Sequence, residues 1–335
     1  MVSIKDVAKK ANVSTATVSR VISRPEAVKE ETSMKVMKAI HELKYQPNVL
    51  ARQLRKLETK TILVIVPDIT NTFFSKVLRG IEYVAVSKGY KVLLGDAGND
   101  VAREGEFLNV LRQKQADGIV LLTARMETSL IEEFALDYPL VLACEYIEGS
   151  TIPTVSIDNI SGARKATEYL ISLGHKKIGM ITGPLNVVLG RDRLKGFSQA
   201  MARHDLPVEP SLVQEGNFTY DSGYNMMLKF LALSNPPTAV FAANDEMAFG
   251  AVKAVKDRRM RVPEDISVIG FDDIEFSSIF EPPLTTISQP TFEIGTTAME
   301  LLLKLINEDE LTRNQYILED KLIERQSCVS NNNPL

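Results

Sequence analysis

The sequence predicts an α/β protein in which a small all-α head precedes a larger body built on parallel sheets. Three observations predict this division. Apolar residues recur at helical spacing near the start of the chain, strand-like and helical stretches alternate from Thr61 onward, and charge separates the two parts. Residues 1–58 carry twelve Lys and Arg against six Asp and Glu, whereas the remaining residues carry 27 against 37. A basic head on an acidic body indicates a nucleic-acid-binding segment.

The head is expected to contain three short helices. From Ile4 to Ala11, the apolar residues follow the i, i+3, i+4, i+7 spacing of one buried helix face. Ser14 is suited to cap a second helix that ends near residue 23, because its hydroxyl can accept hydrogen bonds from the free amides of the first turn. A third helix follows the acidic Glu30 and Glu31, which favour a helix N-terminus.

The second helix separates a polar face from an apolar one. Thr15, Ala16 and Arg20 share the outer face near its N-terminus, where a recognition helix meets base edges in the major groove. Arg20 can contact guanine with two hydrogen bonds, and Thr15 and Ala16 offer small surfaces to a thymine methyl group. Thr17 and Ser19 can bind phosphates. The alternative for each residue alone is a capped surface helix with a solvated arginine.

The body is expected to have two lobes. Between most of its strand-like runs lie helical stretches such as 74–88 and 160–173, which implies right-handed βαβ units and parallel sheets. Eight or more such units are too many for one small sheet. The strand-like runs are residues 62–66, 91–95, 118–122, 140–143, 154–157, 177–182, 239–242 and 267–270. The predicted divisions are a head at 1–46, a linker at 47–58 and a body at 59–329, with lobe 1 at about 59–159 plus part of 290–325 and lobe 2 at about 160–289.

Several classes of protein are disfavoured by the composition. No apolar run approaches the roughly 18 to 20 residues of a membrane span, and residues 1–20 are not signal-like, so we expect a cytoplasmic protein without membrane association. Cys144 and Cys328 lie far apart with no metal-ligand spacing, which predicts neither a disulfide nor a metal site. Phosphate-loop, G-x-G-x-x-G and G-x-S-x-G motifs do not occur, so we expect no cofactor, and an enzyme with a DNA-binding head is the weaker alternative.

The motifs of the chain resemble those of one family. Residues 4–8 and 13–21 are similar to the N-terminal signature of the lactose/galactose repressor family, LacI/GalR. Further similar motifs are Tyr45-Gln46-Pro47-Asn48, Ile65-Val66-Pro67-Asp68, Gly174-His175, Arg193-Leu194-Lys195-Gly196-Phe197, Asn244-Asp245-Glu246-Met247-Ala248, Gly270-Phe271-Asp272-Asp273 and Pro282-Pro283-Leu284-Thr285-Thr286-Ile287. The resemblance is greatest to the cytidine regulator and catabolite control branches. It implies a helix-turn-helix head, a hinge helix, a two-lobed body of the type I periplasmic-binding-protein kind, and a homodimeric regulator, mostly a repressor, of pseudo-palindromic double-stranded operator DNA.

The resemblance also implies DNA contacts from the linker. Leu54 matches a DNA-binding position of the family, at which the leucine of each hinge helix is wedged into the central base step, and Asn48 and Arg55 are expected to contact DNA beside it. Arg52 and Lys56 supply further cations. The alternative is that Leu54 packs under the body. Arg55 and Lys56 stand where the family more often has small residues, which predicts stronger phosphate binding by this hinge.

The resemblance further implies a small-molecule site between the lobes. The residues that match effector-contacting positions of the family are Asn71, Phe73, Phe74, Asp158, Arg193, Phe218, Asn244, Asp272 and Gln289. Arg193 and Asp272 can together grip vicinal hydroxyls; alternatively they pair with each other as structural ions, and the phenylalanines belong to the core. Val187 and Leu189 stand where several sugar-binding relatives carry polar side chains. The expected effector is a sugar, a sugar phosphate or a nucleoside.

Control by a phosphorylated protein partner is an alternative implied by the catabolite control branch. Arg79 fits such docking on the outer face of lobe 1. Glu281, however, stands where that branch is expected to carry a cation. The sequence therefore favours a small-molecule effector over a phosphoprotein.

Overall fold

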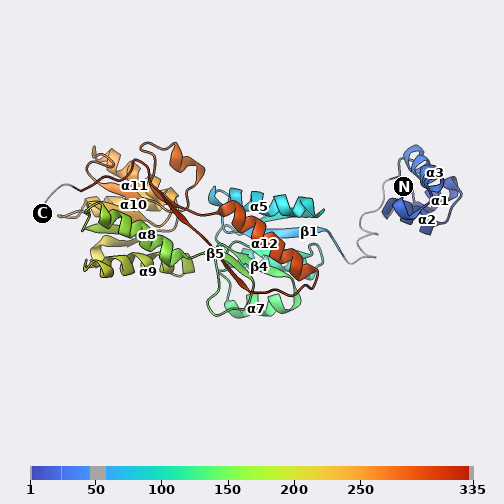
Figure 1. The fold of residues 1–335 in the computed structure, drawn as a ribbon, viewed down its shortest axis with the longest axis horizontal. Helices are drawn as coiled ribbons and strands as arrows, with labels where there is room; N and C mark the ends of the chain where they lie inside the picture. Colours follow the sequence, from blue (N-terminus) through green and yellow to red (C-terminus); the bar gives the residue numbers. More distant parts are fainter. Residues whose placement is uncertain (1, 24, 46–57, 332–335) are drawn as a thin grey trace. The chain divides into compact units, whose positions relative to one another are not determined.

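The computed structural model describes residues 2–23, 25–45 and 58–331, and the chain divides into two units, Met1–Glu58 and Thr59–Leu335 (Figure 1). The first unit is helical and the second combines helices with sheets. Both parts agree with the predicted fold class, which is confirmed. Within the described part of the chain, no helix has the length and apolar character needed to cross a membrane.

The head has helices α1 (Ile4–Ala11), α2 (Thr15–Ser23) and α3 (Glu30–Glu42), with a short 3₁₀ helix, η1 (Pro25–Ala27), between the last two. Asn12 ends α1 in the left-handed conformation, at a φ of 52°, which asparagine tolerates better than most residues. The hydroxyl of Ser14 accepts a hydrogen bond of 3.1 Å from the amide of Thr17, which confirms the predicted cap of α2. The side chains shared by the three helices form the head's own core: Val7, Ala8, Ala11, Val18, Val21, Val36 and Ala39.

The body is built on two parallel sheets. The six-stranded sheet, which defines lobe 1, has the order β11-β5-β4-β3-β1-β2, and the four-stranded sheet, which defines lobe 2, has the order β7-β6-β8-β9. A third, two-stranded sheet pairs β10 with β12 antiparallel. The strands are β1 (Thr61–Val66), β2 (Lys91–Asp96), β3 (Gly118–Leu121), β4 (Leu140–Ala143), β5 (Thr154–Ile157), β6 (Ile178–Thr182), β7 (Val213–Glu215), β8 (Ala239–Ala242), β9 (Ser267–Ile269), β10 (Thr286–Ser288), β11 (Gln315–Leu318) and β12 (Lys321–Ile323).

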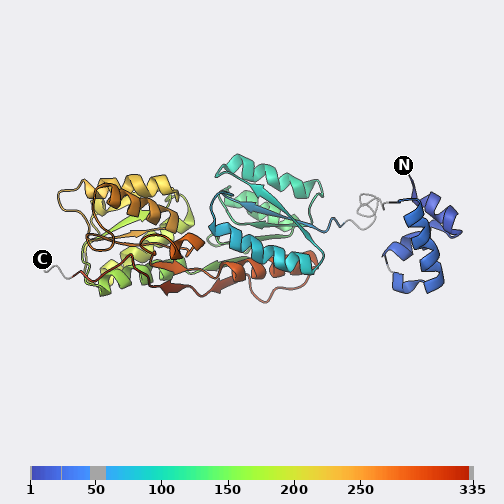
Figure 2. The ribbon, with the colours of Figure 1, turned by 90° about the horizontal axis from the view of Figure 1, so that it is seen from above.

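Helices cover both faces of each sheet, as Figure 2 shows. In lobe 1, α5 packs against α12, and in lobe 2, α8 packs against α9 and α10 against α11. Central strands such as β1 are buried along almost their whole length because both faces are covered. The helices of the body are α5 (Phe73–Ser87), α6 (Val101–Arg112), α7 (Thr128–Asp137), α8 (Asn159–Ser172), α9 (Val188–Arg203), α10 (Tyr220–Leu231), α11 (Asp245–Asp257) and α12 (Thr291–Ile306), with short 3₁₀ helices η2 (Pro210–Leu212) and η3 (Glu275–Ser278).

The C-terminal segment contributes to both lobes, and its red ribbon runs along both of them in Figures 1 and 2. Helix α12 and strand β11 belong to lobe 1, whereas the following residues return to lobe 2. There the Val268 amide donates to the Ser327 carbonyl at 2.9 Å. The buried ring of His175 fixes the same segment, since its Nε2 lies 3.0 Å from the carbonyl oxygen of Val329 and its Nδ1 lies 2.9 Å from the Thr238 hydroxyl. The crossing segments connect the lobes and set the position of the space between them.

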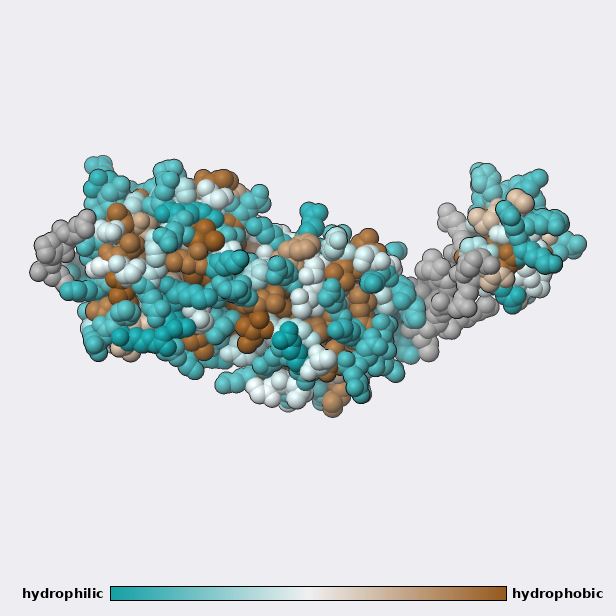
Figure 3. Space-filling model, in the orientation of Figure 1, coloured by the Kyte–Doolittle hydropathy of each residue, from teal (hydrophilic) through white to brown (hydrophobic). Residues whose placement is uncertain are grey.

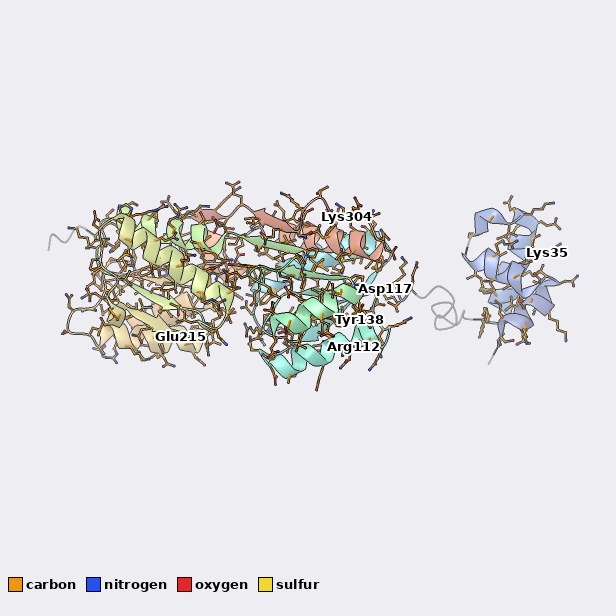
Figure 4. All side chains as sticks on the ribbon, turned by 90° about the horizontal axis from the view of Figure 1, so that it is seen from below. Lys35, Arg112, Asp117, Tyr138, Glu215 and Lys304 are labelled. Atoms are coloured by element: carbon orange, nitrogen blue, oxygen red, sulfur yellow. The ribbon has the colours of Figure 1, made fainter. Side chains whose placement is uncertain are left out.

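Asp117 joins the beginning of the body to the central strand β3 and is labelled in Figure 4. Its carboxylate accepts hydrogen bonds from the amide and hydroxyl of Thr59, both at 2.7 Å, and from the amide of Lys60 at 2.8 Å. Three bonds to one carboxylate fix the chain where it enters the first strand of lobe 1. On the face of the body drawn in Figure 3, brown apolar groups interrupt a mostly hydrophilic surface.

Candidate functional site

The outer face of α2 presents the residues that the sequence assigns to base contacts. Thr15, Ala16 and Arg20 are exposed, whereas Thr17 and Ser19 are half-buried. The Thr17 hydroxyl lies 2.9 Å from the Ser14 hydroxyl, so it takes part in the helix cap. These three exposed side chains lie on the face of α2 opposite the buried Val18 and Val21. The linker residues Asn48, Leu54 and Arg55, and with them Arg52 and Lys56, lie outside the described residues.

A cavity between the two lobes brings together eight of the nine residues assigned to effector contacts. It lies at the carboxyl ends of parallel strands, among them β1, β3, β4, β8 and β9, where ligands of open α/β sheets bind. The eight residues are Asn71, Phe73, Phe74, Arg193, Phe218, Asn244, Asp272 and Gln289. The site is therefore assembled from segments that are up to about 200 positions apart in the sequence.

The ninth residue, Asp158, does not line this cavity. Its exposed carboxylate caps α8 by accepting a hydrogen bond of 2.9 Å from the Ser161 amide. It lines a separate depression beside β5 together with Tyr146 and Asp192. A carboxylate at a helix N-terminus is stabilised by the free amides there, which accounts for this residue without a ligand.

Arg193 and Asp272 form the buried ionic centre of the cavity. Arg193 Nη2 lies 3.3 Å from Asp272 Oδ1, and the two side chains are 3% and 9% exposed. Arg193 Nε donates to Asn159 at 3.0 Å, Nη1 donates to the carbonyl of Ala243, and the guanidinium lies 3.8 Å from the centre of the Phe271 ring. The predicted alternative of a structural ion pair is thus present, and the pair also lines the cavity.

Asp272 is held in an unusual backbone conformation, with a φ of 114°. Its carboxylate accepts a hydrogen bond of 2.8 Å from Gln289 Nε2. Burial raises the pKa of Asp272 to about 6, against the opposing effects of Arg193 and Gln289. Such backbone strain is maintained only where the surroundings fix the residue, and it is concentrated at functional sites.

Asp245 supports the segment that carries Asp272. Its fully buried carboxylate accepts hydrogen bonds from the Ile274 amide at 3.0 Å, the Ser277 hydroxyl at 2.7 Å and the Thr286 hydroxyl at 2.6 Å. Burial, followed by the nearby charge of Asp272, raises the pKa of Asp245 to about 7. The three hydrogen bonds link the N-terminus of α11 to the part of the loop that follows Asp272 and to the start of β10.

Three phenylalanines form the aromatic wall. The rings of Phe73 and Phe74 meet edge to face, with centroids 5.2 Å apart. Phe218 adopts a φ of 67°, and its carbonyl accepts a hydrogen bond of 2.9 Å from Asn244 Nδ2. Its ring occupies the place that a side chain at Gly183 would need, so glycine is required there. Phe73 is 7% exposed, and Phe74 and Phe218 pack against the core, so the predicted core role and the cavity position coexist.

Sequence reasoning missed a set of polar residues on the cavity wall: Asp68, Asn99, Arg125, Glu145 and Glu246. Arg125 Nη1 donates to the Asn99 side chain, and the buried Glu145 accepts a hydrogen bond of 2.9 Å from the Ala124 amide. Burial raises the pKa of Glu145. Four of these residues follow the ends of β1 to β4, so the strand-end rule that points to Asn71 also points to them.

Val187 and Leu189, which are apolar where several sugar-binding relatives carry polar side chains, lie in different places. Leu189 lines the inner cavity, whereas Val187 is buried and lines an adjoining outer cleft between the lobes. Throughout residues 2–23, 25–45 and 58–331, no group of three or more His, Cys, Asp or Glu side chains is arranged to hold a metal ion. Cys144 lines the cavity as a buried thiol whose pKa is raised by burial.

Comparison with known proteins matches both parts of the chain. The model for bacterial regulatory proteins of the lacI family matches residues 3–48, and the model for the periplasmic binding protein-like domain matches residues 167–328. The HTH-type transcriptional repressor CytR of Escherichia coli K12 is 43% identical over 97% of this chain and 95% of its own length. Catabolite control protein A of Priestia megaterium is 38% identical over 97% and 99%. A crystal structure of the Lac repressor dimer bound to operator and the anti-inducer ONPF superposes with a TM-score of 0.89 at 30% identity, covering 98% of this chain and 99% of that one.

Proposed function

The chain belongs to the LacI family of bacterial regulatory proteins and is a DNA-binding transcriptional regulator, and from this premise we propose that a small ligand between its lobes controls its affinity for operator DNA. The observation that carries the proposal is the buried Arg193–Asp272 pair on the wall of an inter-lobe cavity. A cavity with aromatic walls and a few fixed polar groups is the general form of a small-molecule site. We propose a repressor, with a sugar or a nucleoside as the effector.

The proposed effector contacts are of two kinds, polar and apolar. Arg193 and Asp272 are proposed to bind vicinal hydroxyls, with Gln289 and Asn244 fixing the surrounding loops. Phe73, Phe74, Phe218 and Leu189 supply the apolar surface for a ring face or edge. A ligand without hydroxyls would leave the remaining hydrogen-bonding capacity of these buried groups unused, which gives the site its selectivity.

Ligand binding is proposed to act on DNA through the angle between the lobes. Tyr146, which follows β4 of lobe 1, donates a hydrogen bond of 2.7 Å to Asp192 on α9 of lobe 2, so closure of the cleft and this contact depend on each other. A ligand that binds one lobe angle more tightly shifts the population toward that state, by no more than its differential affinity for the two states.

On the DNA side, Arg20, Thr15 and Ala16 are proposed to read base edges, and Thr17 and Ser19 to contact phosphates. For Asn48, Leu54 and Arg55, the hinge contacts implied by the family remain a proposal.

We further propose that the chain forms a homodimer through lobe 1. Five large apolar side chains are exposed on the neighbouring elements α5, β2 and α12: Tyr83, Val86, Leu93, Leu94 and Phe292. The rings of Tyr83 and Phe292 already contact each other, with centroids 5.8 Å apart. Large exposed apolar side chains on neighbouring elements are typical of an interface between subunits. Two-fold symmetry of the dimer would match a pseudo-palindromic operator.

A thermal-shift screen of the full-length protein against sugars and nucleosides tests the effector proposal. A ligand that binds only the folded state and is present at 100 times its Kd stabilises the protein by about 2.7 kcal/mol. We expect one compound class to raise the Tm of the wild-type protein and to have no effect on Arg193→Lys, because lysine cannot reproduce the guanidinium fork. An equal shift in the variant would contradict the assignment of Arg193.

Regulation by a phosphorylated protein is the second candidate, supported by the 38% identity to catabolite control protein A. Arg79 is exposed on α5, but the exposed Glu281 places a negative charge where the docking of a phosphoprotein favours a cation. We therefore rank control by a phosphoprotein second, after a small-molecule effector, and an enzymatic role third. Firm binding of a phosphorylated carrier protein in a pull-down would place the phosphoprotein first. Turnover of a bound ligand would place the enzymatic role above it.

A further inference from the structure

The cavity between the lobes has more negative than positive groups on its walls. Four carboxylates line it, from Asp68, Glu145, Glu246 and Asp272, against the guanidinium groups of Arg125 and Arg193. Both guanidinium groups donate to acceptors within the protein, although Arg125 Nε has no partner among the described residues. Arg193 donates to Asn159 and Ala243 and pairs with Asp272, and Arg125 donates to Asn99. A ligand therefore meets an excess of hydrogen-bond acceptors.

Glu246 is the acceptor with the fewest partners. It lies half-buried in the first turn of α11, and within the described part of the chain no side chain or amide donates a hydrogen bond to its carboxylate and no cation pairs with it. Burial, then the charges of Asp272 and Asp68, raises the pKa of Glu246 to about 7. The electrostatic potential at this carboxylate is therefore negative. A hydrogen-bond donor or a cation placed beside it would stabilise the ionised carboxylate.

Asp68 provides a second acceptor from the opposite lobe. Its Oδ1 accepts hydrogen bonds from the Thr70 amide at 2.8 Å and the Thr70 hydroxyl at 2.6 Å. Among the described residues, nothing donates to its Oδ2. Asp68 follows β1 in lobe 1, whereas Glu246 begins α11 in lobe 2, and the charge of Asp68 reaches Glu246. Acceptors from both lobes therefore line the same cavity.

We propose that the effector carries an amino group whose N–H donors are bound by Glu246, with Asp68 as the second acceptor, so that Glu246 determines specificity. This inference rests on the proposed function of the same cavity. Hydroxyls of the ligand engage Arg193 and Asp272, and its amino group engages the acidic end. A phosphate is disfavoured by the same argument, because it would add negative charge to a cavity that four carboxylates already line.

Calorimetric titration of the full-length protein with matched ligand pairs tests the inference. The pairs are glucosamine with glucose, adenosine with inosine, and cytidine with uridine, and glucose 6-phosphate is added as an anionic probe. In at least one pair, the amino member is expected to bind at least about tenfold more tightly than its partner. A hydrogen bond to a charged group accounts for a difference in affinity of this size. Glu246→Gln should remove most of this preference, and Glu246→Asp, which keeps the charge, should retain it.

Glu264→Gln is the matched control, because it removes an exposed carboxylate from lobe 2 outside the cavity wall, and it should bind like the wild type. Equal binding of both members of every pair, preferential binding of the phosphate, or an amino preference that survives Glu246→Gln would overturn the inference and leave the effector site intact. If no ligand of the panel bound the wild-type protein, both the effector site and the inference would be contradicted.

Discussion

At the scale of single residues, the buried Arg193–Asp272 pair contributes to the stability of the protein. Removing one partner of a buried ion pair leaves an uncompensated charge, so Arg193→Met is expected to lower the free energy of unfolding by about 3–5 kcal/mol. The double variant Arg193→Met/Asp272→Asn should lose less than the sum of the two single variants. Chemical denaturation of the four proteins measures the coupling, and additive losses would show that the pair does not act as a unit.

Arg20 is the residue on which sequence readout depends most. Arg20→Ala is expected to cost about 1–3 kcal/mol of operator binding and to relax specificity at one base position, because we propose that the guanidinium forms two hydrogen bonds to guanine. The measurement is binding to an operator selected from a random library and to its single-base variants. Lys35→Ala, on the exposed face of α3, is the control and is labelled in Figure 4. Equal weakening on all operator variants would make Arg20 a phosphate contact.

Much of the effector site could be predicted from residues that match family motifs, and what was missed has a physical explanation. Arg193, Asp272 and Gln289 stand at recognisable positions and meet in the structure. Glu246 lies within a motif that was recognised, but the sequence does not show that it lines the same cavity as Asp68 from the other lobe. Asp158 matches a family effector position, but local sequence does not show that its carboxylate caps α8 outside this cavity.

At the scale of elements, His175 ties the end of α8 to the crossing C-terminal segment. A carbonyl only accepts, so Nε2 carries the proton toward Val329, and Nδ1 is left to accept from Thr238. Burial lowers the pKa of His175 below its usual value. The unfolded chain therefore binds a proton at higher pH than the folded one, and stability is lost as the pH falls below about 6.5.

The His175→Gln variant tests this contribution. It should be less stable than the wild type at pH 8, and the gap should narrow as the pH falls toward 5, because only the wild type has a histidine to protonate. The raised pKa values of Asp245 and Asp272 act in the opposite direction in both proteins, since a buried acid contributes less stability as the pH rises through its folded pKa. The difference between the two proteins isolates His175. A gap independent of pH would contradict the assignment.

The central strands could be predicted from the sequence because buried parallel strands are continuous apolar runs, as residues 62–66 are. The four strands that were missed have three or four residues each: β7, β10, β11 and β12. β7, Val-Gln-Glu, forms the edge of its sheet, and β11 is an edge strand with two exposed residues. Such strands are specified by the neighbour with which they pair, which local periodicity does not reveal.

At the scale of the whole molecule, the exposed apolar surface on α5, β2 and α12 predicts a dimer. Val86 is 64% exposed in the single chain, so Val86→Asp should fold normally and weaken self-association by about tenfold or more if the surface is an interface. Leu136→Asp is the matched control, because Leu136 is 86% exposed on α7. Sedimentation equilibrium measures both. Wild-type association in both variants would place the interface elsewhere.

The central claim is that the cleft between the lobes controls operator binding, and the most direct test is the operator affinity of the full-length protein with and without a ligand that binds the cleft. Titration of a labelled operator is expected to show a change of about 5- to 150-fold when the ligand saturates the wild-type protein. Asp272→Ala, at the same ligand concentration, should show no change. An operator affinity that stays the same while the ligand is bound would contradict the account.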